Sequence, residues 1–310
     1  MKNTIKKLID LSPRQGANAK KTADFIIAYL KQNNIKTTAE NFPLEIPIIK
    51  KAVLLGDGKS ISCAGCSFVG GAIENKDYIL SSLIPSRYFL DKPNINFNPK
   101  SNFISLSNFY FAPAVAVKSS DLKKITKAKK VKGEVIVEKF KGKIPNITVG
   151  NKKNPKTIIF SHYDSIGPGA IDNASGVAVC LEVIVKFPQV LKDNLFVFDG
   201  NEELSYDYPT YWGKGFRIFE KKYLSIMEKS KKILILDCLG NGKTQKTNNL
   251  NVLKLAFPIK NIKKWQKKTF TLFGDIEKLM GVYHSSGDND SQLEEKYLKE
   301  SVRALIKELA

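Results

Sequence analysis

From about residue 155 onward, apolar runs that are typical of buried strands alternate with segments of helical periodicity. The runs that we expect to form strands are 157–161, 195–198, 233–237, 251–257 and 269–273. Helices are expected over 175–187, 216–229 and 290–309, and Pro188 stops the first of them. Strands that are apolar along their whole length are buried on both faces. The pattern therefore predicts an α/β fold, a three-layer sandwich whose central, mostly parallel mixed sheet carries helices on both faces.

The first half of the chain has a different texture. Residues 16–33 show helical periodicity, and 36–42 alternate as a strand would. Between about 48 and 148, short β-type runs are separated by Gly, Pro, Ser and Asn turns; these runs are 52–55, 78–83, 103–106, 115–117 and 135–137. We therefore expect one main domain, made of residues 1–47 and 149–310, and a β-rich insertion of residues 48–148.

The composition is that of a globular protein. The chain has 310 residues, of which 43% are apolar and 10% aromatic, so it can bury a sizeable core. No apolar run approaches the roughly 18–20 residues of a membrane span. The basic N-terminal segment lacks the apolar region of a signal peptide, and we therefore expect a cytoplasmic location.

The net charge of +20 raises nucleic acid, an anionic membrane surface and acidic substrates as partners. The lysines are, however, spread along the chain, and the densest cluster, 123–132, could contact a polyanion only weakly. The arginines are Arg14, Arg87, Arg217 and Arg303. Because phosphate and base recognition favours the bidentate arginine fork, we favour a lysine-rich solvated surface over nucleic-acid binding.

The four cysteines give a weak signal. Cys63 and Cys66 have the spacing of a metal clip or redox pair, but no second pair follows. Two ordinary small residues or a local disulfide are favoured over a zinc ribbon. Cys180 lies in an apolar helical run, and Cys238 follows Asp237, so on a strand its side chain would point to the opposite face.

The two histidines, His162 and His284, each follow a short apolar stretch. Imidazole is the commonest transition-metal ligand, and a ligating ring usually donates its second N–H to a carboxylate. Asp164 and Asp288 are close enough in sequence to be those partners. A lone histidine is more often a hydrogen-bonded structural residue, so these two become informative only together with nearby acids.

Acidic residues follow the predicted strands where the carboxyl ends of a parallel sheet would lie. Asp172 precedes the apolar helix, Glu202 and Glu203 follow the strand 195–198, and Asp237 closes the strand 233–237. Taken singly, these acids suit a helix cap, an exposed loop and a turn. Ligands bind at this edge of such sheets, and nitrogen and oxygen donors suit zinc-type ions. The acids and both histidines together therefore favour a site for a pair of divalent metals, in which one member of the Glu-Glu pair handles protons.

The order of these motifs carries a family resemblance. His-x-Asp, then Gly-Ala-x-Asp-Asn-Ala-Ser-Gly at 169–176, Glu-Glu, Asp-x-x-Gly and a late His resembles the M28-type zinc aminopeptidases, which are co-catalytic di-zinc metallopeptidases. The resemblance covers 155–240 and the surroundings of His284, and the start at 12–16 is also similar. The segment 111–125 resembles part of the protease-associated insertion of that family.

The resemblance implies two Zn²⁺ ions, or similar divalent metals, per chain. His162 and Asp237 would bind one ion, and Glu203 and His284 the other. Asp172 would bridge the two.

The same resemblance implies three catalytic roles. Glu202 would be the general base that activates a metal-bridging water and returns the proton to the leaving amine. Asp164 would orient His162. Tyr283 would help to stabilise the tetrahedral oxyanion, although an aromatic residue packing at a strand end explains it equally well.

The implied function is that of a zinc-dependent exopeptidase that hydrolyses peptide amide bonds, with an aminopeptidase as the first choice. The alternatives are a carboxypeptidase, a glutaminyl-cyclase-like enzyme, or a basic nucleic-acid-binding protein on the same fold. The intact set of five ligands argues against the last two. Two departures put the specificity in doubt: the aromatic loop 204–212 replaces a glycine-rich turn, and only 47 residues separate Asp237 from His284.

Overall fold

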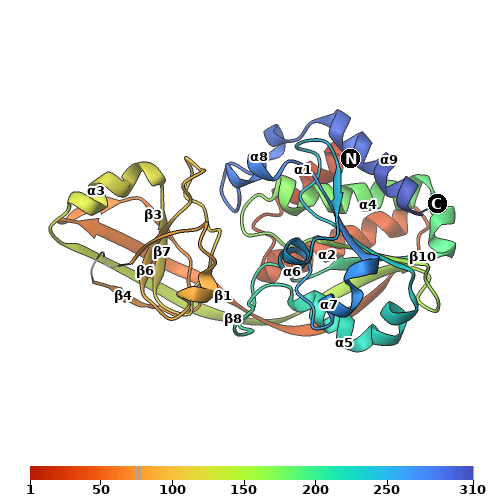
Figure 1. The fold of residues 1–310 in the computed structure, drawn as a ribbon, viewed down its shortest axis with the longest axis horizontal. Coiled ribbons are helices and arrows are strands. Elements are labelled where there is room, and N and C mark those ends of the chain that lie inside the picture. Colours follow the sequence, from red (N-terminus) through yellow and green to blue (C-terminus); the bar gives the residue numbers. More distant parts are fainter. Residues whose placement is uncertain (75, 77, 310) are drawn as a thin grey trace.

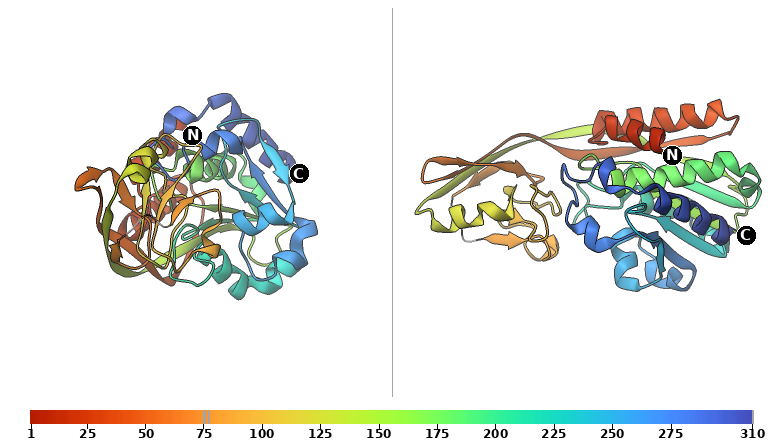
Figure 2. Two further views of the ribbon diagram at one scale, coloured as in Figure 1. Left: turned by 60° about the vertical axis from the view of Figure 1, so that its left-hand side comes forward. Right: turned by 90° about the horizontal axis from the view of Figure 1, so that it is seen from above.

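The computed structural model describes all residues except 75, 77 and 310 (Figure 1). A larger α/β body contains both termini, and a smaller β-rich part lies to one side of it (Figures 1 and 2). Two long strands run between these parts. Within the described residues, no helix combines the length and apolar character needed to cross a membrane.

The larger sheet has the strand order β12-β13-β11-β9-β10-β8-β1-β2, and β4 also pairs with β8. Its central strands are parallel: β13 (Thr269–Phe273), β11 (Lys232–Leu236), β9 (Thr157–His162) and β10 (Asn194–Asp199). The flanking strands β12 (Gln245–Thr247) and β8 (Val131–Gly150) pair antiparallel with this centre. The predicted α/β class with a mixed sheet is confirmed, and parallel pairing is confined to the centre.

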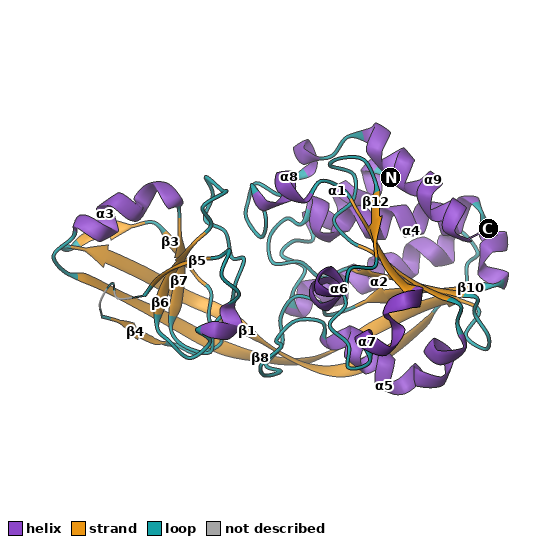
Figure 3. Cartoon of the chain, in the orientation of Figure 1, coloured by secondary structure: helices purple, strands orange, loops and turns teal. Residues whose placement is uncertain are grey.

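Side chains of the central strands alternate between the two faces of the sheet, and helices cover both faces. Ile158 and Phe160 of β9 pack against one set of helices, whereas Ile159 packs against the other. The first set is α5 (Lys214–Lys229), α6 (Leu250–Ala256) and α7 (Ile262–Trp265). The second set is α1 (Lys2–Asp10), α2 (Gly16–Gln32), α4 (Ser175–Lys186) and α9 (Glu295–Leu309). The resulting three layers place the carboxyl ends of the parallel strands together at one edge (Figure 3).

The β-rich part is carried on a long antiparallel ribbon. Strand β1 (Thr38–Gly56) pairs with β8 along its whole length, with a register shift after Ile49. A second sheet has the order β3-β7-β6-β5. The remaining elements of this part are β2 (Lys59–Ile61), β3 (Cys63–Gly65), β4 (Gly71–Ile73), β5 (Ile79–Ser81), β6 (Asn94–Phe97), β7 (Ala114–Val117) and α3 (Leu122–Lys127). The divisions at 47/48 and 148/149 fall within the two ribbon strands, and a separate inserted domain stays a prediction.

Two predicted strands are wrong. Residues 251–257 form helix α6, because the Asn249 side chain accepts from the backbone N–H groups of Asn251 and Val252 and so caps a helix there. Leu253 is buried while Leu255 is 64% exposed, which fits one buried helix face. Residues 103–106 are a loop: the backbone N–H of Leu106 donates to the carbonyl oxygen of His284, and that of Phe103 donates to Oγ of Ser101, instead of to a neighbouring strand. All four cysteines are free thiols.

Arg14 joins the N-terminal segment to the loop that follows β9. Its side chain is fully buried, and Nε donates to the carbonyl oxygen of Tyr163 at 2.7 Å. The two Nη atoms donate to the carbonyl oxygens of Pro168 at 2.8 Å, Gly169 at 3.0 Å and Leu8 at 3.3 Å. Burial lowers the pKa of Arg14 to about 10, so the guanidinium remains charged at neutral pH. One side chain therefore fixes the backbone next to His162.

Replacing Arg14 tests this anchoring role. Arg14→Met keeps most of the volume but leaves four carbonyl oxygens without their donor, so we expect the free energy of unfolding to fall by about 3 kcal/mol or more. Denaturant unfolding measures the change. The exposed Arg87→Met is the matched control and should shift stability by less than about 0.5 kcal/mol. Equal effects of the two substitutions would contradict the anchoring role.

Candidate metal centre

Side chains from several loops meet at the carboxyl edge of the parallel strands. His162 is the last residue of β9, and Asp237 directly follows β11. Asp172 lies in the π-helical turn Ala170–Ala174 that leads into α4, and Glu203 lies in the loop after β10. His284 lies in the turns after the short helix α8 (Ile276–Met280). The chain order of these elements therefore brings together residues that are far apart in sequence.

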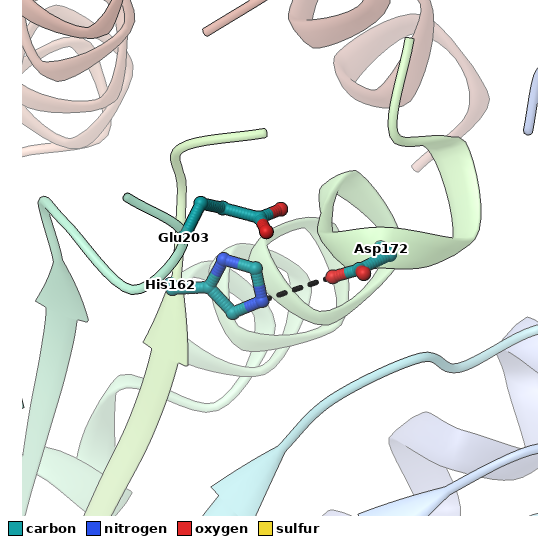
Figure 4. Close-up of side chains that lie close together, drawn as sticks. All are labelled: His162, Asp172 and Glu203. Atoms are coloured by element: carbon teal, nitrogen blue, oxygen red, sulfur yellow. Dashed lines mark ion pairs between the residues drawn. The ribbon is translucent and has the colours of Figure 1, made fainter. Parts of the chain in front are cut away.

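Asp172 occupies the centre of the cluster. Its Oδ1 lies 3.1 Å from Nε2 of His162, and its Oδ2 lies 3.2 Å from Nε2 of His284. The same His162 nitrogen is 3.4 Å from Oδ1 of Asp237, and the His284 nitrogen is 2.9 Å from Oε2 of Glu203. The carboxylates of Asp172 and Glu203 point toward the space beside the His162 ring (Figure 4). Two groups of possible ligands thus share one carboxylate.

The donor atoms fit a divalent metal. Ligand atoms of His162, Asp172 and Glu203 lie within 4.8 Å of one another, as do those of Asp172, Asp237 and Cys238. Among the described residues, neither His284 Nε2 nor Glu203 Oε1 has a hydrogen-bond partner, although both atoms are buried. A buried imidazole nitrogen that faces carboxylate oxygens needs either a proton or a metal cation between them. Such nitrogen and oxygen donors suit zinc-type ions.

Cys238 lies on the cluster side, contrary to the sequence prediction. Strand β11 ends at Leu236, and Cys238 has a φ of 57°, so strand alternation does not apply to it. Its Sγ donates to Oδ1 of Asp237 at 3.2 Å. Asp237 nevertheless shares its Oδ1 with the His162 nitrogen.

Asp164 orients two parts of the cluster. Its Oδ1 lies 3.3 Å from Nδ1 of His162 and accepts from the backbone N–H of Glu202 at 2.9 Å. Its Oδ2 accepts from the backbone N–H of Glu203 at 3.0 Å and from Nε2 of Gln15 at 3.4 Å. One buried carboxylate thus fixes the His162 ring and the backbone of the Glu-Glu pair.

The second histidine is held differently from the sequence expectation. His284 Nδ1 lies 3.2 Å from the carbonyl oxygen of Leu106, which belongs to the β-rich part. Asp288 instead accepts from the backbone N–H groups of Ile171 at 2.7 Å and Asp172 at 3.2 Å. The prediction that Asp288 partners His284 is therefore wrong. Asp288 holds the backbone that carries Asp172.

Acidic side chains outnumber basic ones in the cluster. Burial opposes protonation of His162 and His284, but the surrounding carboxylates outweigh it and raise the pKa of both imidazoles well above its usual range. Burial also opposes ionisation of Asp172, yet its contacts with both imidazoles bring its pKa well below the ordinary value. Burial raises the pKa of Glu203 to about 7. In the metal-free protein, protons on the imidazoles therefore supply charge that metal cations can replace.

Glu202 and Tyr283 border the same space. Burial, together with the neighbouring Glu203, Asp164 and Asp237 charges, raises the pKa of Glu202 well above its usual range. The Tyr283 ring stacks on the His284 imidazole, with 3.7 Å between ring centroids. Burial also raises the pKa of Tyr283 well above its ordinary value, so the phenol stays protonated. Tyr283 lies in a turn, and the alternative of an aromatic residue at a strand end does not apply.

Sequence reasoning missed Asp199, a fully buried acid at the end of β10. Its register partner on β9 is His162, its Oδ1 accepts from the backbone N–H of Asn201 at 3.0 Å, and its Oδ2 has no partner among the described residues. Burial, reinforced by the nearby Asp164 charge, raises the pKa of Asp199 to about 8. Its place directly after an apolar run is the same signal that identified Asp237.

The fold and the cluster together define an α/β protein with a candidate metal centre at the carboxyl edge of its parallel strands. Residues 144–248 match the model of peptidase family M28, and the resemblance predicted from the sequence is confirmed. No curated protein sequence matches the chain significantly.

Solved structures show the same fold. A zinc aminopeptidase from Bacillus subtilis has 17% identity and a TM-score of 0.67, covering 98% of this chain and 92% of that chain. An aminopeptidase from an Aneurinibacillus strain has 16% identity and a TM-score of 0.59, covering 99% and 92%. A glutaminyl cyclase from Porphyromonas gingivalis has 13% identity and a TM-score of 0.53, covering 99% and 95%. At these identities the likeness concerns the fold.

The raised pKa of Asp199 predicts how metal-free stability depends on pH. Between the ordinary carboxyl pKa and about 8, the folded state keeps a proton that the unfolded state has lost, so this group makes stability fall as pH rises. Asp199→Asn removes that dependence. In chelating buffer, the variant's stability relative to the parent should rise by about 1.4 kcal/mol per pH unit between about pH 5 and 7.

Denaturant unfolding at several pH values measures this difference. Asp193→Asn is the control, because that carboxylate is partly exposed and paired with Lys156, which lowers its pKa. The control should leave the slope over this range unchanged. Parallel pH profiles for Asp199→Asn and the parent would show that Asp199 is ionised in the folded state.

Proposed function

We propose that this chain is a zinc-dependent exopeptidase, specifically an aminopeptidase that removes the amino-terminal residue of peptides. The observation that carries the proposal is the position of Asp172, whose two carboxylate oxygens each face a different imidazole nitrogen, at 3.1 and 3.2 Å. A carboxylate shared in this way suits a bridging ligand between two cations. The zinc aminopeptidase from Bacillus subtilis, which shares the fold, supports the choice of metal and reaction.

In this proposal, His162 and Asp237 would hold one ion, Glu203 and His284 would hold the other, and Asp172 would serve both. Two divalent ions would supply a Lewis acid for the scissile carbonyl and lower the pKa of a water molecule. His284 Nε2 and Glu203 Oε1, which have no hydrogen-bond partner among the described residues, would gain one in a bound metal.

Glu202 is the proposed general base. Its backbone is fixed by Asp164, and its carboxylate makes no hydrogen bond within the described residues, so it is free to act on water. Its carboxylate would accept a proton from water and then give it to the leaving amine. Amide nitrogen is a poor leaving group, and its protonation is therefore required.

Asp164 and Tyr283 complete the proposed machinery. Asp164 accepts from His162 Nδ1 and keeps Nε2 directed at Asp172 and Asp237. The Tyr283 phenol remains protonated and can donate a hydrogen bond to the carbonyl oxygen as negative charge develops on it.

A glutaminyl-cyclase-like reaction is the second candidate, because cyclases from Porphyromonas gingivalis and Tannerella forsythia share the fold over 95% of their chains. The two reactions give different products. Mass spectrometry of one peptide beginning with leucine and one beginning with glutamine separates them. Loss of the first residue supports an aminopeptidase, loss of ammonia from the glutamine peptide supports a cyclase, and trimming from the other end supports a carboxypeptidase.

The proposed ligand set predicts the metal content. Protein loaded with zinc and then dialysed should retain about two ions per chain. His284→Ala removes a ligand from one group only and should reduce the content to about one ion. Elemental analysis gives the ratio, with the exposed Glu138→Gln as control. Absence of bound metal after loading would contradict the site.

The proposed base predicts a separation of turnover from metal binding. Glu202→Gln keeps the shape but cannot accept a proton, so kcat should fall by about 10²-fold or more while the metal content stays unchanged. Aminoacyl anilide hydrolysis and elemental analysis measure the two properties, again with Glu138→Gln beside it. Undiminished turnover in Glu202→Gln would eliminate Glu202 as the base.

A further inference from the structure

The aromatic loop 204–212, between β10 and α5, is closed by backbone hydrogen bonds next to Glu202. The N–H of Gly213 donates to the carbonyl oxygen of Glu202 at 2.5 Å. Within the loop, the backbone N–H of Ser205 and its Oγ both donate to the carbonyl oxygen of Tyr211, at 2.7 and 2.8 Å. The position of the Glu202 backbone therefore depends on how the far end of this loop is held.

The side chain of Tyr211 extends from this loop into the β-rich part, where it is only 7% exposed. Its hydroxyl oxygen accepts from the backbone N–H of Phe109 at 3.0 Å and lies 3.5 Å from Oγ of Ser86. Burial raises the pKa of Tyr211 to about 12, so the hydroxyl stays neutral. Tyr211 is thus held through its carbonyl oxygen by the loop after Glu202 and through its hydroxyl by the β-rich part.

Aromatic rings extend the same contact. The Phe68 ring of the β-rich part has centroid distances of 5.3 Å to Tyr211 and 5.2 Å to Tyr206. Tyr206 also donates its hydroxyl to the carbonyl oxygen of Phe68 at 2.8 Å. Tyr208 packs edge-on against Phe111, but it is 69% exposed and its hydroxyl has no hydrogen-bond partner in the described part of the chain. Tyr211 is therefore the buried anchor of the loop, and Tyr208 lies at its exposed rim.

The β-rich part contacts a second loop of the candidate metal centre. The Leu106 N–H donates to the carbonyl oxygen of His284 at 2.9 Å, and the Leu106 carbonyl oxygen lies 3.2 Å from His284 Nδ1. The strands β1 and β8 carry the β-rich part, and these loop contacts fix it against the α/β body. It thus touches both the loop that follows the proposed base and the loop that carries a proposed ligand.

We propose that Tyr211 is a positioning residue for Glu202, because it ties the loop of the general base to the β-rich part. The inference rests on the proposed role of Glu202. Tyr211 acts through the backbone of the loop and needs no contact with substrate or metal. Its effect on rate follows from geometry, since a displacement of about 1 Å at a reacting group can lower the rate by about 10²-fold.

The first test is Tyr211→Phe, which keeps the ring and removes the hydroxyl that accepts from Phe109. In zinc-loaded protein, kcat for an aminoacyl anilide, expressed per bound zinc pair, should fall about 10-fold. KM should stay within about twofold and the metal content should not change, because neither binding nor the ligand set is altered. Tyr208→Phe is the matched control, since it removes an unpaired hydroxyl from the same loop and should keep the parent's kcat.

A purely structural role for Tyr211 predicts a different result. Such a role would lower the free energy of unfolding of Tyr211→Phe and leave kcat per bound zinc pair equal to that of Tyr208→Phe. That outcome would overturn the positioning role.

A double-mutant cycle tests whether Tyr211 acts through Glu202. Glu202→Gln already lacks the base, so adding Tyr211→Phe should lower the residual kcat by less than about twofold. A 10-fold loss in both backgrounds would show that the effect does not pass through Glu202, and the assignment would be wrong.

Hydrogen exchange separates this inference from the proposed function. In zinc-loaded protein, the backbone amides of residues 201–206 should exchange about 5-fold faster in Tyr211→Phe than in the parent or Tyr208→Phe. If the parent hydrolyses no anilide but exchange still depends on the Tyr211 hydroxyl, the aminopeptidase function fails and the anchoring of the loop stands. If the parent is active and Tyr211→Phe changes neither kcat nor exchange, the function stands and the positioning role fails. Faster exchange with an unchanged kcat would also overturn that role.

Discussion

The burial of Asp172 between two imidazoles is the interaction around which the rest of the centre is built. Several carboxylates share a space from which water is largely removed, and isolated buried charges are among the most costly features of a folded protein. The surrounding structure therefore has to supply cations and to prevent the acids from moving apart. The raised pKa of both imidazoles is the response of the metal-free protein to that requirement.

The backbone around the centre is held by side chains that are not themselves proposed metal ligands. Asp288 binds the N–H groups at Ile171 and Asp172, and Asp164 binds those of the Glu-Glu pair. Arg14 holds the loop that follows β9 by donating to its backbone carbonyl oxygens. Each of these buried charges satisfies backbone groups that helices and strands leave unpaired, so the same contacts stabilise the loops and align the centre.

The sequence was sufficient for the parts of the fold that depend on local patterns. Continuous apolar runs predicted the parallel strands, and acids at their ends predicted which residues gather at the sheet edge. Helix α6 was missed because its apolar run also suits a strand, and the Asn249 cap outweighs that preference. The direction of Cys238 was missed because strand β11 ends two residues before it.

No local sequence pattern indicates which distant segments come into contact. Leu106 and His284 are 178 residues apart, and a backbone carbonyl can come from any residue type, so nothing in the sequence points to this pair. Chemistry alone favoured the acidic neighbour Asp288 as the partner of His284 Nδ1. Asp288 instead lies near Ile171 and accepts from two backbone N–H groups there. A carbonyl oxygen at His284 Nδ1 also adds no negative charge to a centre that already has an excess of it. Because that acceptor comes from the β-rich part, the orientation of His284 depends on the loop that contains Leu106, and a change in this loop acts on the metal centre.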